Sequence, residues 1–292
     1  MTESTPWPMA GRVCVVTGAS SGIGKATSVA LTRLGATVVL VCRDRTRGEA
    51  AMAEVAAAAA ATTGNPGQPS LELADLSSME QVRAVAARLA QLPRLDVLIN
   101  NAGLVVARRQ LTADGFELTL AVNHLATFLL TNLLRPNLAA SAPARVVTVS
   151  SIAHRAAMLS LDDLQSERRY LAMLAYANSK LANVLFTREL ARRLDGSGVT
   201  ANCLHPGTVH SSFGHTGALW LRLGLVIGGG MLRTPASGAR TVVYLASAPE
   251  VAAQTGGYYV NSKHRRPSRQ ARDDHLAREL WDISARLTGL AT

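Results

Sequence analysis

The chain has 292 residues, 48% of them hydrophobic, which is enough to bury the core of one large α/β domain. Its 30 basic and 20 acidic residues give a formal net charge of +10, but the arginines are scattered and the one dense basic run covers residues 263–272. A net positive charge gives non-specific attraction to polyanions but does not by itself form a surface that recognises nucleic acid. We therefore expect no nucleic-acid partner.

We also expect a cytoplasmic protein without a transmembrane segment. Residues 1–11 lack the basic and apolar regions of a secretory signal. The most hydrophobic stretch, 218–232, contains an arginine and is shorter than the roughly 20 residues that a spanning helix needs. Two roles stay open for this stretch: peripheral contact with a membrane, or covering an apolar ligand. Cys14, Cys42 and Cys203 lie in apolar runs without metal-type spacing, which is typical of buried reduced thiols.

Apolar strand-like runs alternate with helical stretches along the chain. Strands are predicted at 12–17, 37–42, 95–100, 145–150 and 199–204, with weaker candidates near Leu71 and Tyr258. Helices are predicted at 22–34, 46–61, 77–91, 115–138 and 170–194. This alternation predicts a doubly wound α/β Rossmann fold, in which a parallel sheet of about seven strands has helices on both faces. We expect a single domain over 1–292, with a core at about 10–262, a substrate flap at about 210–235 and a basic C-terminal extension at 263–292.

The sequence TGASSGIGKA follows the first predicted strand and opens the first helix. Glycines at such a turn let backbone N–H groups and the helix N-terminus approach a pyrophosphate, where the helix dipole favours negative charge. The predicted cofactor contacts in this turn are Gly18, Ser20, Ser21, Gly22, Ile23 and Gly24. Lys25 would add positive charge beside the phosphates.

The end of the second strand indicates which dinucleotide binds. NAD sites usually place an acid there to accept a hydrogen bond from the ribose. Here the strand ends in Cys42, followed by Arg43, and a guanidinium can bind a 2′-phosphate bidentately. NADP(H) is therefore favoured over NAD(H), with Asp44 as the counter-evidence.

Tyr176 and Lys180 are four residues apart and share one face of a predicted helix. In isolation, this spacing is usually an aromatic ring packed over a lysine stem. A free phenol titrates near pH 10, so a phenol that exchanges a proton at neutral pH needs a cation to stabilise its phenolate. Lys180 would supply that charge.

Five motifs together resemble the short-chain dehydrogenase/reductase family. They are TGASSGIG, the NNAG of 100–103, Asn123, the VSS of 149–151 and the YANSK of 176–180, and they occur in the order of the family over about residues 10–262. Within that family, HLATFLLTNLL, DLQSERRY and SKLANVLFTREL are most similar to the retinol dehydrogenase-like subgroup.

The resemblance implies roles for individual residues. Tyr176 would be the general acid or base, Lys180 would tune it and hold the nicotinamide ribose, and Ser151 would hydrogen-bond the substrate oxygen. Asn123 would hold a water that connects Lys180 to solvent. The residues implied along the rest of the cofactor are Asp75, Leu76, Asn101, Ala102, Gly103, Pro206, Gly207 and Val209. Family members commonly form dimers or tetramers through the helices of Asn123 and Tyr176, so a homodimer or homotetramer is implied as well.

One segment departs from the shorter reductases. Tyr176 follows Ser151 by 25 positions, and the extra residues, 154–175, are expected to form a wall of the substrate pocket. Tyr170 in this segment has no lysine four residues later, so packing and a hydroxyl contact are expected for it. The histidines at 124, 154 and 205 lack ligand-like spacing with a carboxylate, so we expect hydrogen-bonding roles and no metal site.

These observations predict an NADP(H)-dependent oxidoreductase that interconverts an alcohol and an aldehyde or ketone on an apolar small molecule. Met158, Leu159 and the run 219–227 indicate an apolar substrate. Three alternatives stay open: a non-catalytic NADP-binding sensor or scaffold, a ketoreductase for a polyketide or steroid, and a nucleic-acid role for the basic run.

Overall fold

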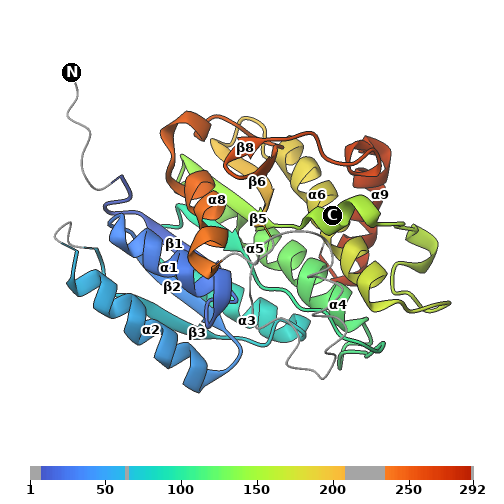
Figure 1. The fold of residues 1–292 in the computed structure, drawn as a ribbon, viewed down its shortest axis with the longest axis horizontal. Helices are drawn as coiled ribbons and strands as arrows, with labels where there is room; N and C mark the ends of the chain where they lie inside the picture. Colours follow the sequence, from blue (N-terminus) through green and yellow to red (C-terminus); the bar gives the residue numbers. More distant parts are fainter. Residues whose placement is uncertain (1–7, 63–65, 208–233, 291–292) are drawn as a thin grey trace.

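The computed structural model describes residues 8–62, 66–207 and 234–290. Its centre is an eight-stranded sheet with the order β3-β2-β1-β4-β5-β6-β7-β8, and helices cover both faces (Figure 1). The strands are β1 (Val13–Thr17), β2 (Thr37–Cys42), β3 (Ser70–Leu73), β4 (Val97–Asn100), β5 (Ala144–Val149), β6 (Val199–His205), β7 (Tyr258–Val260) and β8 (Lys263–His264). The chain reverses its winding direction between β1 and β4, and ligands of such sheets bind at this switch point, outside the carboxyl ends of the strands.

The helices confirm the predicted alternation of strands and helices. They are α1 (Gly22–Arg33), α2 (Arg45–Ala60), α3 (Met79–Leu89), α4 (Leu118–Leu120), α5 (Ala126–Ala140), α6 (Ala172–Arg193), α8 (Pro235–Ser247) and α9 (Asp274–Leu287). Shorter turns are the π-helical η1 (Ala121–Leu125) and the 3-10 helices η2 (Ile152–Ala156), η3 (Leu161–Asp163), η4 (Pro249–Val251) and η5 (Gln270–Arg272). The sequence did not predict α8 and α9.

The two faces of the sheet carry separate hydrophobic cores, as β1 shows. Val13 and Val15 face the cluster shared with α3, α5 and α9, whereas Cys14 and Val16 face the cluster shared with α1, α2 and α8. Side chains alternate between faces along a strand, so a strand buried on both faces must be apolar throughout. This requirement explains the run VCVVT. All three cysteines are free and buried, as predicted.

The sheet differs from the expected seven parallel strands by one short addition. β8 pairs antiparallel with β7, whereas all other strand pairs of the sheet are parallel. The connecting residues, Asn261 and Ser262, both have positive φ, at 53° and 58°. Positive φ at both central positions is the geometry of a type I′ turn, which joins two antiparallel strands most tightly.

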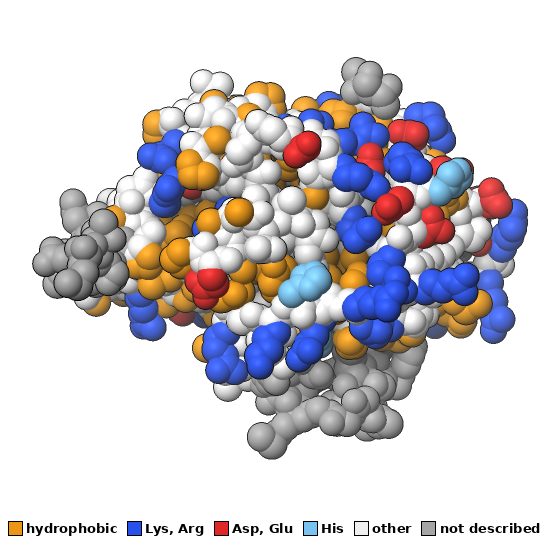
Figure 2. Space-filling model, turned by 90° about the horizontal axis from the view of Figure 1, so that it is seen from above, with side chains coloured by type: hydrophobic (Ala, Val, Ile, Leu, Met, Phe, Trp, Pro, Cys, Tyr) orange, Lys and Arg blue, Asp and Glu red, His pale blue; other side chains and the backbone are white. Residues whose placement is uncertain are grey.

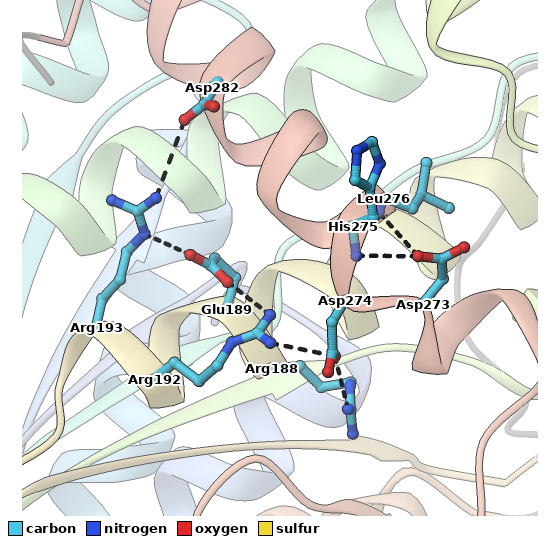
Figure 3. Close-up of polar contacts among 9 residues, drawn as sticks. All are labelled: Arg188, Glu189, Arg192, Arg193, Asp273, Asp274, His275, Leu276 and Asp282. Carbon is cyan, nitrogen blue, oxygen red and sulfur yellow. Dashed lines mark hydrogen bonds and ion pairs between the residues drawn. The ribbon is translucent and has the colours of Figure 1, made fainter.

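The helix α9 packs along α6 and is fastened to it by charged side chains (Figure 3). The Asp274 carboxylate forms ion pairs with Arg188 at 3.0 Å and with Arg192 at 3.2 Å. Arg193 lies over the ring of Trp281, 4.4 Å from its centroid. Asp273 caps α9 by accepting from the backbone N–H of His275 and Leu276. The segment expected to be an extension beyond the core thus contributes a helix that packs on α6.

On one face of the molecule the surface charge is mixed rather than of one sign. Figure 2 shows one face on which Lys and Arg side chains gather toward one end, interspersed with Asp and Glu. None of the helices in the described ranges is long and apolar enough to cross a bilayer. The predicted flap at 210–235 lies almost wholly outside the described residues.

Candidate active site

The glycine-rich turn after β1 packs directly against the turn after β4. Gly18 has a φ of +65°, and a Cβ added to it would lie only 2.8 Å from the Cα of Ala102. The Asn101 side chain donates to the carbonyls of Thr17 at 2.9 Å and Gly18 at 3.2 Å. The Thr17 hydroxyl in turn accepts from the backbone N–H of Asn101 and Ala102. Asn101 therefore braces the turn on which the predicted cofactor would lie.

The N-terminus of α1 has the features of an anion site. The side chain of the N-cap residue Ser21 makes no capping hydrogen bond, and the first turn contains no acidic residue. Unpaired N–H groups and the helix dipole at such an end favour a phosphate. Ile23 packs against the core under the turn. Lys25, however, makes an ion pair with Glu54 at 2.6 Å, so its charge is shared with α2.

Gly24→Ala is expected to disrupt this turn. A Cβ at Gly24 would collide with the Gly18 carbonyl and lie 2.5 Å from the Asn101 amide nitrogen. Overpacking of this kind costs about 1–3 kcal/mol, so we expect a lower melting temperature and loss of dinucleotide binding in a fluorescence titration. Gly11→Ala is the control: its φ is +70° but the space around it is open, so it should lose stability only. Unchanged dinucleotide affinity in Gly24→Ala would mean that the turn does not hold the cofactor.

The carboxyl end of β2 presents an exposed arginine beside a neutral thiol. Burial raises the pKa of Cys42 to about 11, so the thiol stays uncharged at neutral pH. The Asp44 carboxylate caps α2 by accepting from the backbone N–H of Arg47 at 2.8 Å. Arg43 is exposed between them. Asp44 thus has a structural task, which weakens it as evidence for NAD.

Tyr176 and Lys180 lie on the same face of α6, as their spacing predicts. Lys180 is 2% exposed, and its ammonium donates to the Val149 carbonyl at 3.0 Å, at the carboxyl end of β5. The same ammonium lies 5.7 Å from the centroid of the Tyr176 ring. Tyr176 is partly buried against Val105 and Ala172. The structure therefore brings the phenol and the ammonium to the carboxyl edge of the sheet.

Ser151 meets Tyr176 directly. It is the second residue after β5 and N-caps η2, where its hydroxyl accepts from the backbone N–H of Ala153 at 3.2 Å. Its side chain also hydrogen-bonds that of Tyr176. A substrate oxygen placed beside both hydroxyl groups would be within reach of two donors at once.

Asn123 lies in the π-helical turn η1 and is fully buried. Its oxygen accepts from the N–H of Leu104 at 2.7 Å, while its nitrogen donates to the Leu104 carbonyl at 3.0 Å and to the Ser179 hydroxyl at 2.9 Å. Ser179 donates in turn to the Tyr176 carbonyl at 2.8 Å. Sequence reasoning missed Ser179, although its position between Tyr176 and Lys180 was a signal. These contacts leave one lone pair of the Asn123 oxygen for a water.

Gly103 shows how close Asn123 lies to Lys180. A Cβ at Gly103 would be 3.2 Å from the Asn123 oxygen and 3.3 Å from the Lys180 ammonium. Both polar groups therefore approach the backbone of the NNAG segment. The structure thus brings Gly103, a predicted cofactor contact, beside Asn123 and Lys180.

The pKa of Tyr176 differs from the sequence expectation. Burial raises it to about 12, and the hydrogen bond with Ser151 offsets only part of this effect. Burial also lowers the pKa of Lys180 to about 8. The spacing argument expected the ammonium to lower the pKa of the phenol. Here the ammonium instead bonds the Val149 carbonyl, and desolvation of the phenolate dominates.

Those of the remaining predicted cofactor residues that the structure describes lie along the same edge. The Asp75 carboxylate accepts from both the N–H and the hydroxyl of Ser77 in the turn after β3. Leu76 packs against the core. Pro206 and Gly207 follow β6, where Gly207 has a φ of +89°. Val209 lies outside the described residues.

Tyr170, His124 and His154 make hydrogen bonds with other groups of the protein. Tyr170 donates to the Val106 carbonyl at 3.0 Å, the hydroxyl contact that was predicted for it. His124 lies 2.9 Å from the Ser284 hydroxyl, and burial lowers its pKa to about 4. His154 contacts the Ser151 carbonyl at 2.7 Å. Within the described ranges, no three His, Cys, Asp or Glu side chains come together as metal ligands.

A doubly wound sheet that gathers a tyrosine, a lysine, a serine and an asparagine beside a glycine-rich anion site defines a dinucleotide-dependent oxidoreductase. Residues 12–218 match the short chain dehydrogenase family, and the chain belongs to it. It is 45% identical to human retinol dehydrogenase 14, over 98% of this chain and 88% of the relative, and 42% identical to human retinol dehydrogenase 13, over 96% and 85%. The predicted similarity to the retinol dehydrogenase-like subgroup is confirmed.

Solved structures agree with this assignment. An uncharacterized protein from Mycobacterium paratuberculosis aligns with a TM-score of 0.76 and 37% identity, over 96% of this chain and 94% of that chain. A protein from Beutenbergia cavernae with bound NADP aligns with a TM-score of 0.69 and 30% identity, over 88% and 97%. The family binds NAD(P) and interconverts alcohols and carbonyl compounds of small-molecule substrates, and this activity class applies to the chain.

Proposed function

We propose that the chain catalyses NADP(H)-dependent interconversion of an alcohol and an aldehyde or ketone, on an apolar substrate. The observation that carries the proposal is the Tyr176 hydroxyl in hydrogen-bond contact with Ser151, with Lys180 one turn further along α6. This arrangement places a proton donor, a second hydrogen-bond donor and a cation around one position at the sheet edge.

Each side chain has a distinct task in carbonyl reduction. The bound nicotinamide would supply a hydride to the carbonyl carbon. Because its pKa lies near 12, the Tyr176 phenol is protonated at neutral pH and donates its proton to the carbonyl oxygen. The Ser151 hydroxyl donates to the same oxygen and stabilises its developing negative charge. The Lys180 ammonium stabilises the phenolate that remains.

Exposed apolar side chains support an apolar substrate. Of the large hydrophobic residues in the described ranges, the exposed ones are Leu111, Ile152, Met158, Leu171 and Met173. All lie after the carboxyl ends of β4 and β5 or at the start of α6, which is the side of the sheet that holds Tyr176. The relatives named retinol dehydrogenases favour a long apolar alcohol or aldehyde. Leu159, which the sequence placed with Met158, is buried in the core.

NADPH oxidation with a panel of aldehydes, steroid ketones and quinones tests the proposed activity. Each substrate is measured with NADPH and with NADH. We expect turnover with apolar aldehydes or ketones and a preference for NADPH. Dinucleotide binding without turnover on any class would favour the non-catalytic sensor instead.

The residues at the end of β2 fit a 2′-phosphate. Arg43 is exposed, the Cys42 thiol beside it is neutral, and the Asp44 carboxylate is held by the N-terminus of α2. Arg43 would therefore bind the phosphate without a competing negative charge. The open N-terminus of α1 would hold the pyrophosphate.

Arg43→Ala is expected to raise the KM for NADPH by about 10- to 100-fold, because a charge-assisted contact to phosphate contributes about 1.5–3 kcal/mol. The KM for NADH should change little, since NADH has no 2′-phosphate. Steady-state kinetics with both cofactors measure the two effects. Arg45→Ala is the matched control, because Arg45 is also exposed but pairs with Glu49 within α2. Equal effects of Arg43→Ala on both cofactors would rule out the phosphate contact.

A further inference from the structure

His154 joins the catalytic serine to the C-terminal segment of the chain. Its Nδ1 lies 2.7 Å from the Ser151 carbonyl oxygen, which can only accept, so Nδ1 carries a hydrogen. Its Nε2 accepts from the backbone N–H of Ser268 at 3.2 Å, so Nε2 carries none. The two partners together fix one neutral tautomer of the imidazole.

The surroundings of His154 hold the ring in this state. The residue is 1% exposed, and burial lowers its pKa. The ring of Tyr258 packs against it with 4.8 Å between the centroids. The two hydrogen bonds and the packing of the Tyr258 ring are therefore sufficient to fix the orientation of the neutral imidazole.

The C-terminal partner of His154 is itself anchored to residues 154–175, the predicted wall of the substrate pocket. Arg155 donates to the Arg266 carbonyl at 2.7 Å. Gln270 donates to the Leu159 carbonyl at 2.9 Å. Ser268, between these two anchors, cannot move away from His154 without breaking them.

We propose that His154 is a positioning residue, which holds the Ser151 backbone so that the Ser151 hydroxyl faces the substrate oxygen and Tyr176. The inference rests on the proposed function, because it assigns Ser151 a catalytic task. Ser151 is extended, with φ −157° and ψ 159°, and its hydroxyl is located by the Ala153 N–H. The Ser151 carbonyl also accepts from the backbone N–H of His154, at 3.3 Å. Without the shorter imidazole contact, this longer and weaker bond holds the carbonyl less firmly, and a rotation of the carbonyl redirects the Cα–Cβ bond of the same residue.

Two substitutions separate the two hydrogen bonds of the ring. In His154→Asn, the amide nitrogen can occupy the place of Nδ1 and still donate to the Ser151 carbonyl. In His154→Gln, the amide oxygen can occupy the place of Nε2 and still accept from Ser268, but the donor to Ser151 is lost. Because small misplacements of reacting groups cost up to about 100-fold in rate, we expect kcat to fall about 10- to 100-fold in His154→Gln and less than about threefold in His154→Asn. The KM for NADPH should stay unchanged in both.

Amide hydrogen exchange gives a readout that does not need turnover. The Ala153 amide, which donates to the Ser151 hydroxyl, should exchange faster in His154→Gln and at the wild-type rate in His154→Asn. Val55→Ala, in a buried position of α2, is the control for lost stability and should lower the melting temperature without changing kcat. Equal losses of kcat in the Asn and Gln variants would overturn the inference. An exchange rate of the Ala153 amide that stays at the wild-type value in both variants would overturn it as well. A wild type without turnover would refute the proposed function, while the Ala153 amide would still decide whether His154 holds Ser151.

Discussion

Tyr176→Phe is expected to reduce kcat for carbonyl reduction by about 10²- to 10⁴-fold, the usual contribution of a positioned general acid. The substitution removes only the hydroxyl that contacts Ser151 and keeps the ring between Val105 and Ala172. The affinity for NADPH should therefore change little. Stopped-flow NADPH oxidation measures the chemical step, and a fluorescence titration measures binding.

Tyr170→Phe provides the matched control for this experiment. Tyr170 is a second tyrosine in the same region, and its hydroxyl donates to the Val106 carbonyl. Loss of that hydrogen bond should lower stability by about 1 kcal/mol and leave the chemical step nearly intact. Turnover that survives Tyr176→Phe would exclude this phenol as the acid. Turnover lost equally in both variants would indicate a structural cause.

Local sequence was sufficient for the parts of the fold that depend on local rules. The strand VCVVT could be predicted because burial on both faces leaves no room for polar residues. The Tyr176–Lys180 pair could be predicted because helix geometry places residues four apart on one face. The motif resemblance then assigned Ser151 and Asn123, whose side chains the structure brings to the same edge of the sheet.

The missed elements depend on contacts that are distant in sequence. The helix α9 follows Asp273 as an N-cap and buries Ala277, Leu280 and Trp281 on one face, a signal that the neighbouring basic run obscured. The bond between His154 and Ser268 joins residues 114 positions apart, so no local pattern reveals it. Spacing also could not give the pKa of Tyr176, because burial, rather than the nearest charge, decides its direction.

A hydrogen-bond chain runs from the Asn123 amide through the Ser179 hydroxyl to the Tyr176 carbonyl and joins η1 to α6. η1 and α6 are separated in sequence by α5, β5 and residues 150–171, yet the Asn123 amide donates to both the Leu104 carbonyl and the Ser179 hydroxyl. An amide with both its donors occupied cannot swing toward substrate. Asn123 thus holds the backbone of Leu104, the residue after Gly103, close to Lys180.

Lys180→Met is expected to abolish most turnover without lowering stability at pH 7. The variant has no ammonium to stabilise the Tyr176 phenolate, so kcat should fall by about 10²-fold or more. In the wild type, the pKa of Lys180 near 8 predicts that the rate of reduction declines as the pH rises through about 8 and the ammonium loses its proton. A pH–rate profile checks this decline, and Lys25→Met, which removes a lysine paired with Glu54 at the surface, should leave the profile unchanged.

The stability of Lys180→Met follows from the sign of the same pKa shift. Burial lowers the pKa of Lys180 from 10.5 to about 8, so between these values the unfolded chain binds more protons than the folded chain and the free energy of unfolding rises with pH. At pH 7 the lysine is charged in both states, and the folded state bears the whole desolvation cost. Methionine removes that cost but also the bond to the Val149 carbonyl, which leaves a net gain on the order of 1–2 kcal/mol. Denaturant unfolding of both proteins at pH 7 and pH 10.5 should show the advantage of the variant at pH 7 and its disappearance at pH 10.5, because by then the wild-type lysine is neutral in the folded state. A difference between the two proteins that does not change with pH would show that Lys180 is not a buried charge.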